Sequence, residues 1–301
     1  MSQTVPQDEQ TFPFALPSSQ DGVKLLVKQL ADWANASAKQ DLCNVIFQLD
    51  KSSTGNHIQH VPFPLPEQDS HPRVNFGGGF IASPWDNCRN GCPHFPDRPL
   101  RQRPAVFDAA KTTLTLTKGL RVAQMTPSQI YRAQLAAGTS SVEVVAKIYQ
   151  ISRAGDRDEL FVLLSEALSK RRNWANHIQG FRCEAYAYEK LKKLQGSHVP
   201  YVYGFFKIEL PHKEPSVVMV AEYIKGRPLS ELHGSTLSRE QLVAIGTGIA
   251  GFTHSIAMCG ILTQDFTRAN FMIQPDYMVV GIDFGRIALA CKQHRAITLS
   301  V

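Results

Sequence analysis

The sequence predicts an α+β fold, and two observations support this class. Five segments between residues 109 and 225 have the texture of strands, and one charged, helix-like stretch interrupts them. A further helical pattern begins at Ser238, and two short apolar runs that read as a hairpin follow it. Strands that read as antiparallel, with helices set between groups of them, are the arrangement of α+β proteins.

Residues 1–108 are expected to form an N-terminal extension with one helix and irregular loops. The apolar residues of segment 21–35 recur on one helical face. They are Val23, Leu26, Val27, Leu30 and Trp33. Asp21 is the expected N-cap, because a short polar side chain at that position accepts a hydrogen bond from a free backbone N–H group. Proline, glycine, histidine and asparagine dominate 51–105, a composition typical of loops.

Residues 109–225 are expected to form a mainly antiparallel sheet with one helix packed on it. Alternating threonine and leucine residues at 113–116 predict the first strand. Strand texture also occurs at 130–135, 142–150, 199–210 and 217–224. The long charged segment 156–195 has helical character and separates the third of these strands from the fourth.

Residues 226–301 are expected to contain a helix and a hairpin. The helix begins at Ser238, and four apolar residues mark one of its faces. They are Leu242, Ile245, Ile249 and Phe252. Two short apolar strands, 271–273 and 278–282, flank a turn at Pro275 and Asp276.

Composition limits the class of protein. The chain has 301 residues, 43% hydrophobic and 19% charged, which excludes an extended disordered chain. Its net charge of +6 is too weak to indicate a nucleic-acid partner. We expect no membrane span, because no apolar run approaches 18 residues. Six scattered cysteines and a polar start without a secretory signal predict an intracellular protein, cytoplasmic or nuclear.

The strongest chemical pattern lies at 261–287. Asp265 is followed five residues later by Asn270, and Asp283 comes thirteen residues after Asn270 within the triplet Asp-Phe-Gly. The intervening apolar strands would form a hairpin that brings Asn270 and Asp283 to the same end. Carboxylate and amide oxygens are ligands that Mg²⁺ accepts beside phosphates. A coincidental hairpin with polar turn residues is the plainer alternative, but the joint spacing is hard to meet by chance.

This spacing resembles the catalytic and metal-binding loops of the protein-kinase-like superfamily. The resemblance implies that Asp265 orients the acceptor hydroxyl and that Asn270 and Asp283 hold Mg²⁺. Segment 145–148, Val-Ala-Lys-Ile, resembles the strand whose lysine contacts the ATP phosphates, which makes Lys147 that lysine. Its acidic partner should lie on the next helix. We choose Glu184 and keep Glu189 on the same helix as the alternate.

The stretch 219–226 is similar to the strand of these kinases that runs into the hinge between the lobes. The resemblance implies that backbone groups of Glu222 and Ile224, with Tyr223 between them, bind adenine. Ala221 matches the position that guards the back of the adenine pocket. Within the superfamily, the sequence most resembles the atypical short kinase-like proteins common in fungi. Stretch 194–204 is similar to the stretch that follows the same helix in those proteins.

Three departures from the kinase pattern stand out. Ala123, Met125 and Ser128 occupy the positions of the loop glycines, whose backbone N–H groups approach phosphate in the superfamily. Thr263 and Gln264 replace the histidine and arginine that precede the catalytic aspartate. Only 18 residues follow Asp283 in this sequence, which leaves no room for the usual helical lobe.

The predicted architecture is therefore a bilobal protein-kinase-like fold, with an N-lobe at 109–225 and a truncated C-lobe at 226–301. The predicted activity is transfer of the γ-phosphate of ATP, with Mg²⁺, to a hydroxyl of a protein serine or threonine or of a small molecule. The alternative is a pseudokinase, a nucleotide-binding or scaffold module without catalysis. The missing glycines and the missing helical C-lobe favour the alternative, whereas the five retained polar residues favour the enzyme.

Overall fold

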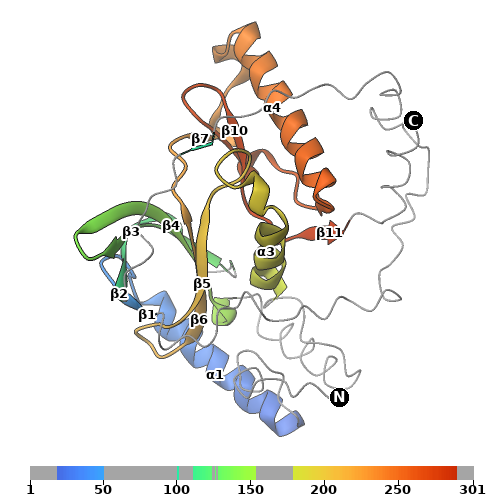
Figure 1. Ribbon diagram of the computed structural model, residues 1–301. Helices are drawn as coiled ribbons and strands as arrows, with labels where there is room; N and C mark the ends of the chain where they lie inside the picture. Colours follow the sequence, from blue (N-terminus) through green and yellow to red (C-terminus); the bar gives the residue numbers. More distant parts are fainter. Residues whose placement is uncertain are drawn as a thin grey trace, which may run out of the picture.

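The computed structural model describes residues 19–50, 100–101, 111–123, 126, 128–153 and 179–289, and Figure 1 shows their arrangement. Within these ranges the chain is built of helices and mainly antiparallel strands, so the predicted α+β class is confirmed. Met125, the loops predicted at 51–105 (apart from residues 100–101) and the helical character predicted for 156–178 lie outside the described residues.

Six strands form an antiparallel sheet in the order β1-β2-β3-β4-β6-β5. The strands are β1 (Ile46–Asp50), β2 (Lys111–Arg121), β3 (Ser128–Ala137), β4 (Ser140–Tyr149), β5 (Val202–Glu209) and β6 (Pro215–Glu222). The last five confirm the strands predicted for 109–225. Strand β1 was not predicted. It lies within the extension and extends the sheet by pairing with β2.

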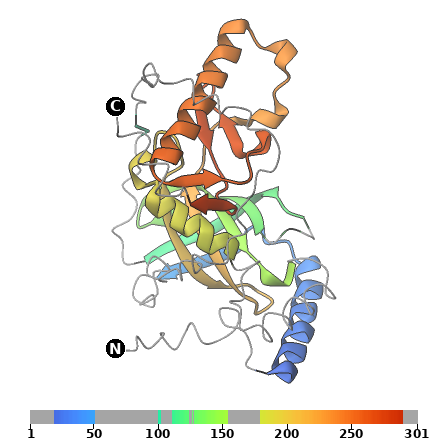
Figure 2. The ribbon, with the colours of Figure 1, turned by 90° about the vertical axis from the view of Figure 1, so that its right-hand side faces the viewer.

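Two helices flank the sheet. Helix α1 (Gln20–Ala38) covers the predicted amphipathic segment, but its N-cap is Ser19 rather than Asp21. Ser19 has an extended backbone and accepts a hydrogen bond from the Gly22 N–H group, whereas Asp21 lies within the first turn. Helix α3 (Gln179–Lys190) carries Glu184 and lies between the sheet and the C-terminal elements (Figures 1 and 2).

The C-terminal elements are one long helix and two small sheets. Helix α4 (Arg239–Met258) starts at the predicted Ser238, which forms a reciprocal capping box with Gln241. Leu242 is 46% exposed and does not belong to the buried face as predicted, while Ile245 and Phe252 do. Among the helices of the described ranges, none is both long and apolar enough to cross a membrane.

Short strands and turns complete this part of the chain. Strands β7 (Arg227–Pro228), β9 (Phe271–Ile273) and β10 (Val279–Gly281) form one small sheet, and β8 (Ile261–Thr263) pairs with β11 (Ile287–Leu289). The hairpin predicted at 271–282 is thus confirmed as β9 and β10. Short 3-10 turns occur at Ile151–Arg153, Lys192–Leu194, Leu229–Glu231, Gly234–Thr236 and Arg268–Asn270.

Two apolar clusters lie on opposite faces of the six-stranded sheet. Successive residues of a strand point to opposite faces. On β4, Ala146 and Ile148 therefore join one cluster, whereas Tyr149 joins the cluster that α1, α3 and α4 complete. Lys147 lies between Ala146 and Ile148 and so emerges on the face that α3 covers. The strand pattern thus places this lysine inside the fold, where it faces the C-terminal loops.

Candidate active site

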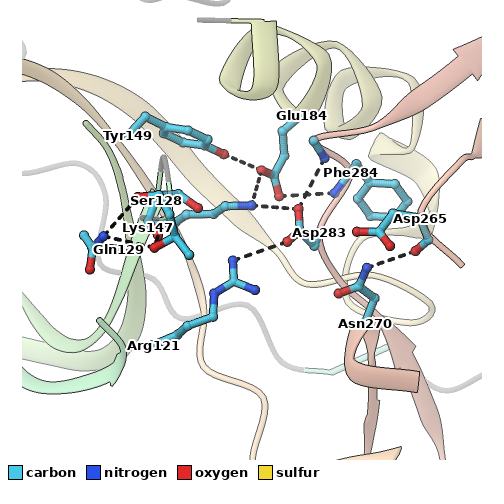
Figure 3. Close-up of polar contacts among 12 residues, drawn as sticks. Arg121, Ser128, Gln129, Lys147, Tyr149, Glu184, Asp265, Asn270, Asp283 and Phe284 are labelled. Carbon is cyan, nitrogen blue, oxygen red and sulfur yellow. Dashed lines mark hydrogen bonds and ion pairs between the residues drawn. The ribbon is translucent and has the colours of Figure 1, made fainter. Parts of the chain in front are cut away.

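The site is built around a buried lysine. The Lys147 side chain is only 6% exposed, and its Nζ lies 2.7 Å from Glu184 Oε2 and 2.8 Å from Asp283 Oδ1 (Figure 3). The predicted pairing of Lys147 with Glu184 is therefore confirmed. The side chain of the alternate, Glu189, is 64% exposed, and its Oε1 lies 4.0 Å from Lys192 Nζ. A strand, a helix and a loop, far apart in sequence, each supply one charge.

The Glu184 carboxylate accepts hydrogen bonds from three groups of this cluster. It is fully buried on α3, and besides Lys147 it accepts hydrogen bonds from the Tyr149 hydroxyl and from the Phe284 backbone N–H group. Sequence reasoning missed Tyr149. Its signal was its position two residues after Lys147, which puts both side chains on one face of β4. Three donors on one carboxylate fix α3 relative to the sheet and to the loop that follows β10.

Asp283 follows β10 in an unusual backbone conformation. Its φ of 63° lies in the left-handed region, which residues other than glycine rarely adopt. Asp283 Oδ1 also accepts from the Gly285 N–H group at 3.3 Å, and its Oδ2 lies 3.6 Å from Arg121 Nη2. Sequence reasoning did not single out Arg121. Both oxygens of the predicted metal ligand therefore face cations of this chain.

Asp265 and Asn270 lie beside this cluster (Figure 3). Asn270 is buried, and its side-chain amide nitrogen donates to the Asp265 backbone carbonyl at 2.9 Å. The Asn270 backbone carbonyl accepts from the Ile282 N–H group. That second bond ties Asn270 to the residue before Asp283, as the predicted hairpin required. The Asp265 carboxylate is half-buried, and within the described part of the chain it has no hydrogen-bond partner.

The residues predicted to bind adenine lie at and just beyond the end of β6. Ala221 and Ile224 are buried, and Tyr223 is half-buried. The Glu222 carboxylate is bound by the Arg101 guanidinium, with Nε to Oε1 at 2.7 Å and Nη2 to Oε2 at 3.1 Å. The Glu222 side chain therefore holds the 100–101 segment against this end of the sheet. The predicted adenine contacts use backbone groups and stay a prediction.

The turn between β2 and β3 is closed by a side chain. Gln129 is fully buried; its Oε1 accepts from the Ala123 N–H group at 3.0 Å, and its Nε2 donates to the Ala123 carbonyl at 2.8 Å. Nε2 also donates to the Thr126 carbonyl at 3.2 Å. Ala123 and Ser128, two of the positions that lack glycine, thus flank a turn held by an amide.

Burial and charge act against one another in this cluster. Burial lowers the pKa of Lys147, but the Glu184 and Asp283 carboxylates outweigh it, so the pKa lies above its ordinary value. Burial raises the pKa of Asp283, yet the cations of Lys147 and Arg121 bring it below its ordinary value. For Glu184 burial prevails over Lys147, and the pKa is raised. Lys147 and Asp283 are therefore charged at neutral pH.

The residues present fit a magnesium ion that arrives with a phosphate ligand. The described ranges contain no group of three or more His, Cys, Asp or Glu side chains that could hold a metal ion. Mg²⁺ is commonly bound by one or two carboxylates together with substrate phosphates. Asp283 and the amide oxygen of Asn270 suit that mode, because the Asn270 nitrogen is already used by Asp265.

Comparison with known proteins assigns no family. No protein-family model matches the sequence, and no curated protein matches it significantly. A functional assignment for this chain therefore depends on the chemistry of the cluster around Lys147 and on the loops that surround it.

The lowered pKa of Asp283 makes its contribution to stability depend on pH. A carboxylate whose pKa is lower in the folded than in the unfolded state stabilises the fold above its ordinary value, here 3.8, and loses that effect as pH falls through the folded value. We expect Asp283→Asn to lower the free energy of unfolding by a constant amount above about pH 5. Urea denaturation of both proteins should show this difference shrinking below about pH 4. A difference that persists unchanged in acid would contradict the ion pair.

Proposed function

We propose that this chain is an ATP- and Mg²⁺-dependent phosphotransferase with a bilobal fold of the protein-kinase type. The observation that carries the proposal is the buried cluster of Lys147, Glu184 and Asp283, joined by contacts of 2.7 and 2.8 Å. A buried lysine held by two carboxylates is a costly arrangement for stability alone. Buried charged groups whose pKa values are shifted by close charged partners concentrate at functional sites.

Each residue of the cluster has a role in this proposal. Lys147 contacts the α- and β-phosphates of ATP, and Glu184 positions Lys147. Asp283 and Asn270 would hold Mg²⁺, which would supply positive charge beside the phosphate oxygens when bound. Asp265 orients the acceptor hydroxyl and accepts its proton, a role open to its carboxylate because no described residue forms a hydrogen bond with it.

The lobes follow from the same assignment. The N-lobe spans 109–225, with α3 as the helix that carries the acidic partner, and residues 226–301 belong to the C-lobe. Adenine binds at the hinge, against Ala221 and the backbone of Glu222, Tyr223 and Ile224. The acceptor is a hydroxyl, on a protein serine or threonine or on a small molecule, because Asp265 can accept the proton of either.

A second candidate is a pseudokinase that binds nucleotide without transferring phosphate. Two observations favour it. The turn between β2 and β3 has a side-chain amide in place of glycines, and Arg121 and Lys147 face the two oxygens of Asp283. A metal must compete with both cations for this carboxylate, which weakens metal binding and with it the transfer step.

The test is a melting experiment followed by a transfer assay. If ATP binds with a Kd near 10 μM, about 1 mM ATP with Mg²⁺ stabilises the protein by roughly 2.7 kcal/mol, or about 5–10 °C in Tm. ATP with a chelator should give a smaller shift. A magnesium-dependent shift with phosphate release or transfer supports the enzyme, and the shift alone supports the second candidate. No shift with any nucleotide, with or without metal, contradicts both.

A further inference from the structure

Arg121 and Lys147 emerge from the same face of the sheet. Arg121, the last residue of β2, is paired with Ile130 on β3, and Ile130 is paired with Lys147 on β4. Residues directly opposite one another on neighbouring strands share a face. An irregularity in the register between Gly119 and Arg121 marks a bulge, and bulges re-aim side chains at strand ends. The end of β2 thus directs Arg121 toward the loop that follows β10.

The two cations hold Asp283 in different ways. Lys147 Nζ is buried and lies 2.8 Å from Oδ1, within hydrogen-bond distance. Arg121 Nη2 lies 3.6 Å from Oδ2, too far for a hydrogen bond, and the Arg121 side chain is 47% exposed. An ion pair at this distance, with one partner half exposed, is weak and is readily exchanged. Arg121 is therefore the partner that Asp283 can release, whereas Lys147 is fixed by Glu184.

The adjoining turn cannot offer one of its backbone donors to an anion. The Ala123 N–H group is bound by Gln129, and the Ala123 carbonyl accepts from both Gln129 and Arg153. Closing the turn in this way uses up a backbone donor of the kind that phosphate-binding loops present to their ligand. Among the described residues, Arg121 is a side chain close enough to Lys147 and Asp283 to supply a phosphate with another donor.

We propose that Arg121 is a phosphate-binding residue that alternates between two partners. In the free protein it neutralises Asp283. When a nucleoside triphosphate binds with a divalent cation, Arg121 moves to the phosphate oxygens and leaves Asp283 to the cation. The planar guanidinium group suits this exchange, because its paired N–H groups fit carboxylate and phosphate oxygens equally well. This inference rests on the proposed nucleotide-binding function and adds to it the residue that replaces the missing loop donors.

The exchange predicts effects of opposite sign when Arg121 loses its charge. Without Arg121, Asp283 Oδ2 loses its competing cation while Lys147 stays on Oδ1, so a metal ion alone should bind more tightly. The phosphates lose a charged donor, so a nucleotide without metal should bind more weakly. A residue with only a structural role would not move the two affinities in opposite directions.

The experiment compares Arg121→Gln with Lys118→Gln, which removes the same charge from an exposed position on the same strand. Binding of Mn²⁺ alone is followed by electron paramagnetic resonance, and binding of ATP and of inorganic tripolyphosphate in EDTA by calorimetry. For Arg121→Gln we expect tighter Mn²⁺ binding and a loss of about tenfold or more in affinity for both phosphate ligands. Lys118→Gln should leave all three affinities within about twofold of the wild type, as expected for a single exposed charge. Melting temperatures of both variants confirm that the fold is intact.

The outcomes separate this inference from the proposed function. ATP binding that does not depend on Arg121 would overturn the role of Arg121 and leave the phosphotransferase standing. Tripolyphosphate binding that depends on Arg121, in a protein that does not bind ATP, would support the phosphate role and remove the nucleotide function. Changes of the same sign for Mn²⁺ and for the phosphate ligands, or no change at all, would overturn the exchange.

Discussion

Replacing Glu184 by alanine is expected to lower the free energy of unfolding by about 3–5 kcal/mol, the usual cost of removing one partner from a buried ion pair. The variant leaves Lys147 buried with Asp283 as its only carboxylate partner among the described residues. The Tyr149 hydroxyl and the Phe284 N–H group lose their acceptor as well. Urea denaturation followed by circular dichroism measures the change.

The matched control is Glu189→Ala on the same helix. The Glu189 side chain is 64% exposed, and its approach to Lys192 at 4.0 Å is an exposed pair of the kind worth under about 1 kcal/mol. Glu184→Gln keeps the shape of the side chain and removes its charge, so its cost should fall between those of the two alanine variants. Equal losses for Glu184→Ala and Glu189→Ala would mean that the buried cluster does not stabilise the fold.

The residues of this cluster could be predicted where local pattern determines them. The β-branched neighbours of Lys147 indicated a strand, and alternation along a strand then placed the lysine on one face. Glu184 could be chosen because the apolar residues of its helix indicated which face is packed. Asn270 and Asp283 were joined by the apolar runs between them, which form β9 and β10 as expected.

Other features depend on pairing between distant segments and left no local signal. Strand β1 has five residues, and it is an edge strand that pairs with β2 across a long connection. Arg121 reaches Asp283 because of the register of β2 against β3 and a bulge beside Gly119, neither of which composition reveals. In the sequence Gln129 is an ordinary polar strand residue, and only the folded turn shows that its amide bonds to the Ala123 backbone.

Helix ends show the same limit on a smaller scale. Ser19 and Asp21 are both good N-cap residues, so the sequence of this segment does not decide between them. The structure starts α1 one residue before Asp21, which leaves Ser19 at the cap and lets Asp21 pair with Lys24 at 3.0 Å. At α4 the prediction succeeded because Ser238 is followed three residues later by Gln241, and this spacing identifies the cap.

The largest effect on activity is expected from Asp265→Asn. If Asp265 orients the acceptor hydroxyl and accepts its proton, the variant should lose about 10²–10⁴-fold in kcat, the usual contribution of a positioned base. Affinity for ATP with Mg²⁺ should change little, because the residues that bind phosphate and metal stay in place. The fold should keep its stability too, since Asn270 bonds to the Asp265 backbone carbonyl and not to its carboxylate.

Asp276→Asn serves as the control for this variant, because the Asp276 carboxylate accepts from the Met278 N–H group in the exposed turn between β9 and β10. It should transfer phosphate at the wild-type rate, which a radiolabelled ATP assay measures alongside calorimetric ATP binding. Loss of transfer with binding retained would identify Asp265 as the residue that acts on the acceptor. Equal loss of transfer and of ATP binding would instead assign Asp265 to the metal and phosphate ligands, and a wild-type rate would remove it from the reaction. The separation of these results is possible because Asp265 adjoins the charged cluster without sharing its ion pairs, so its carboxylate can be changed while Lys147, Glu184 and Asp283 keep theirs.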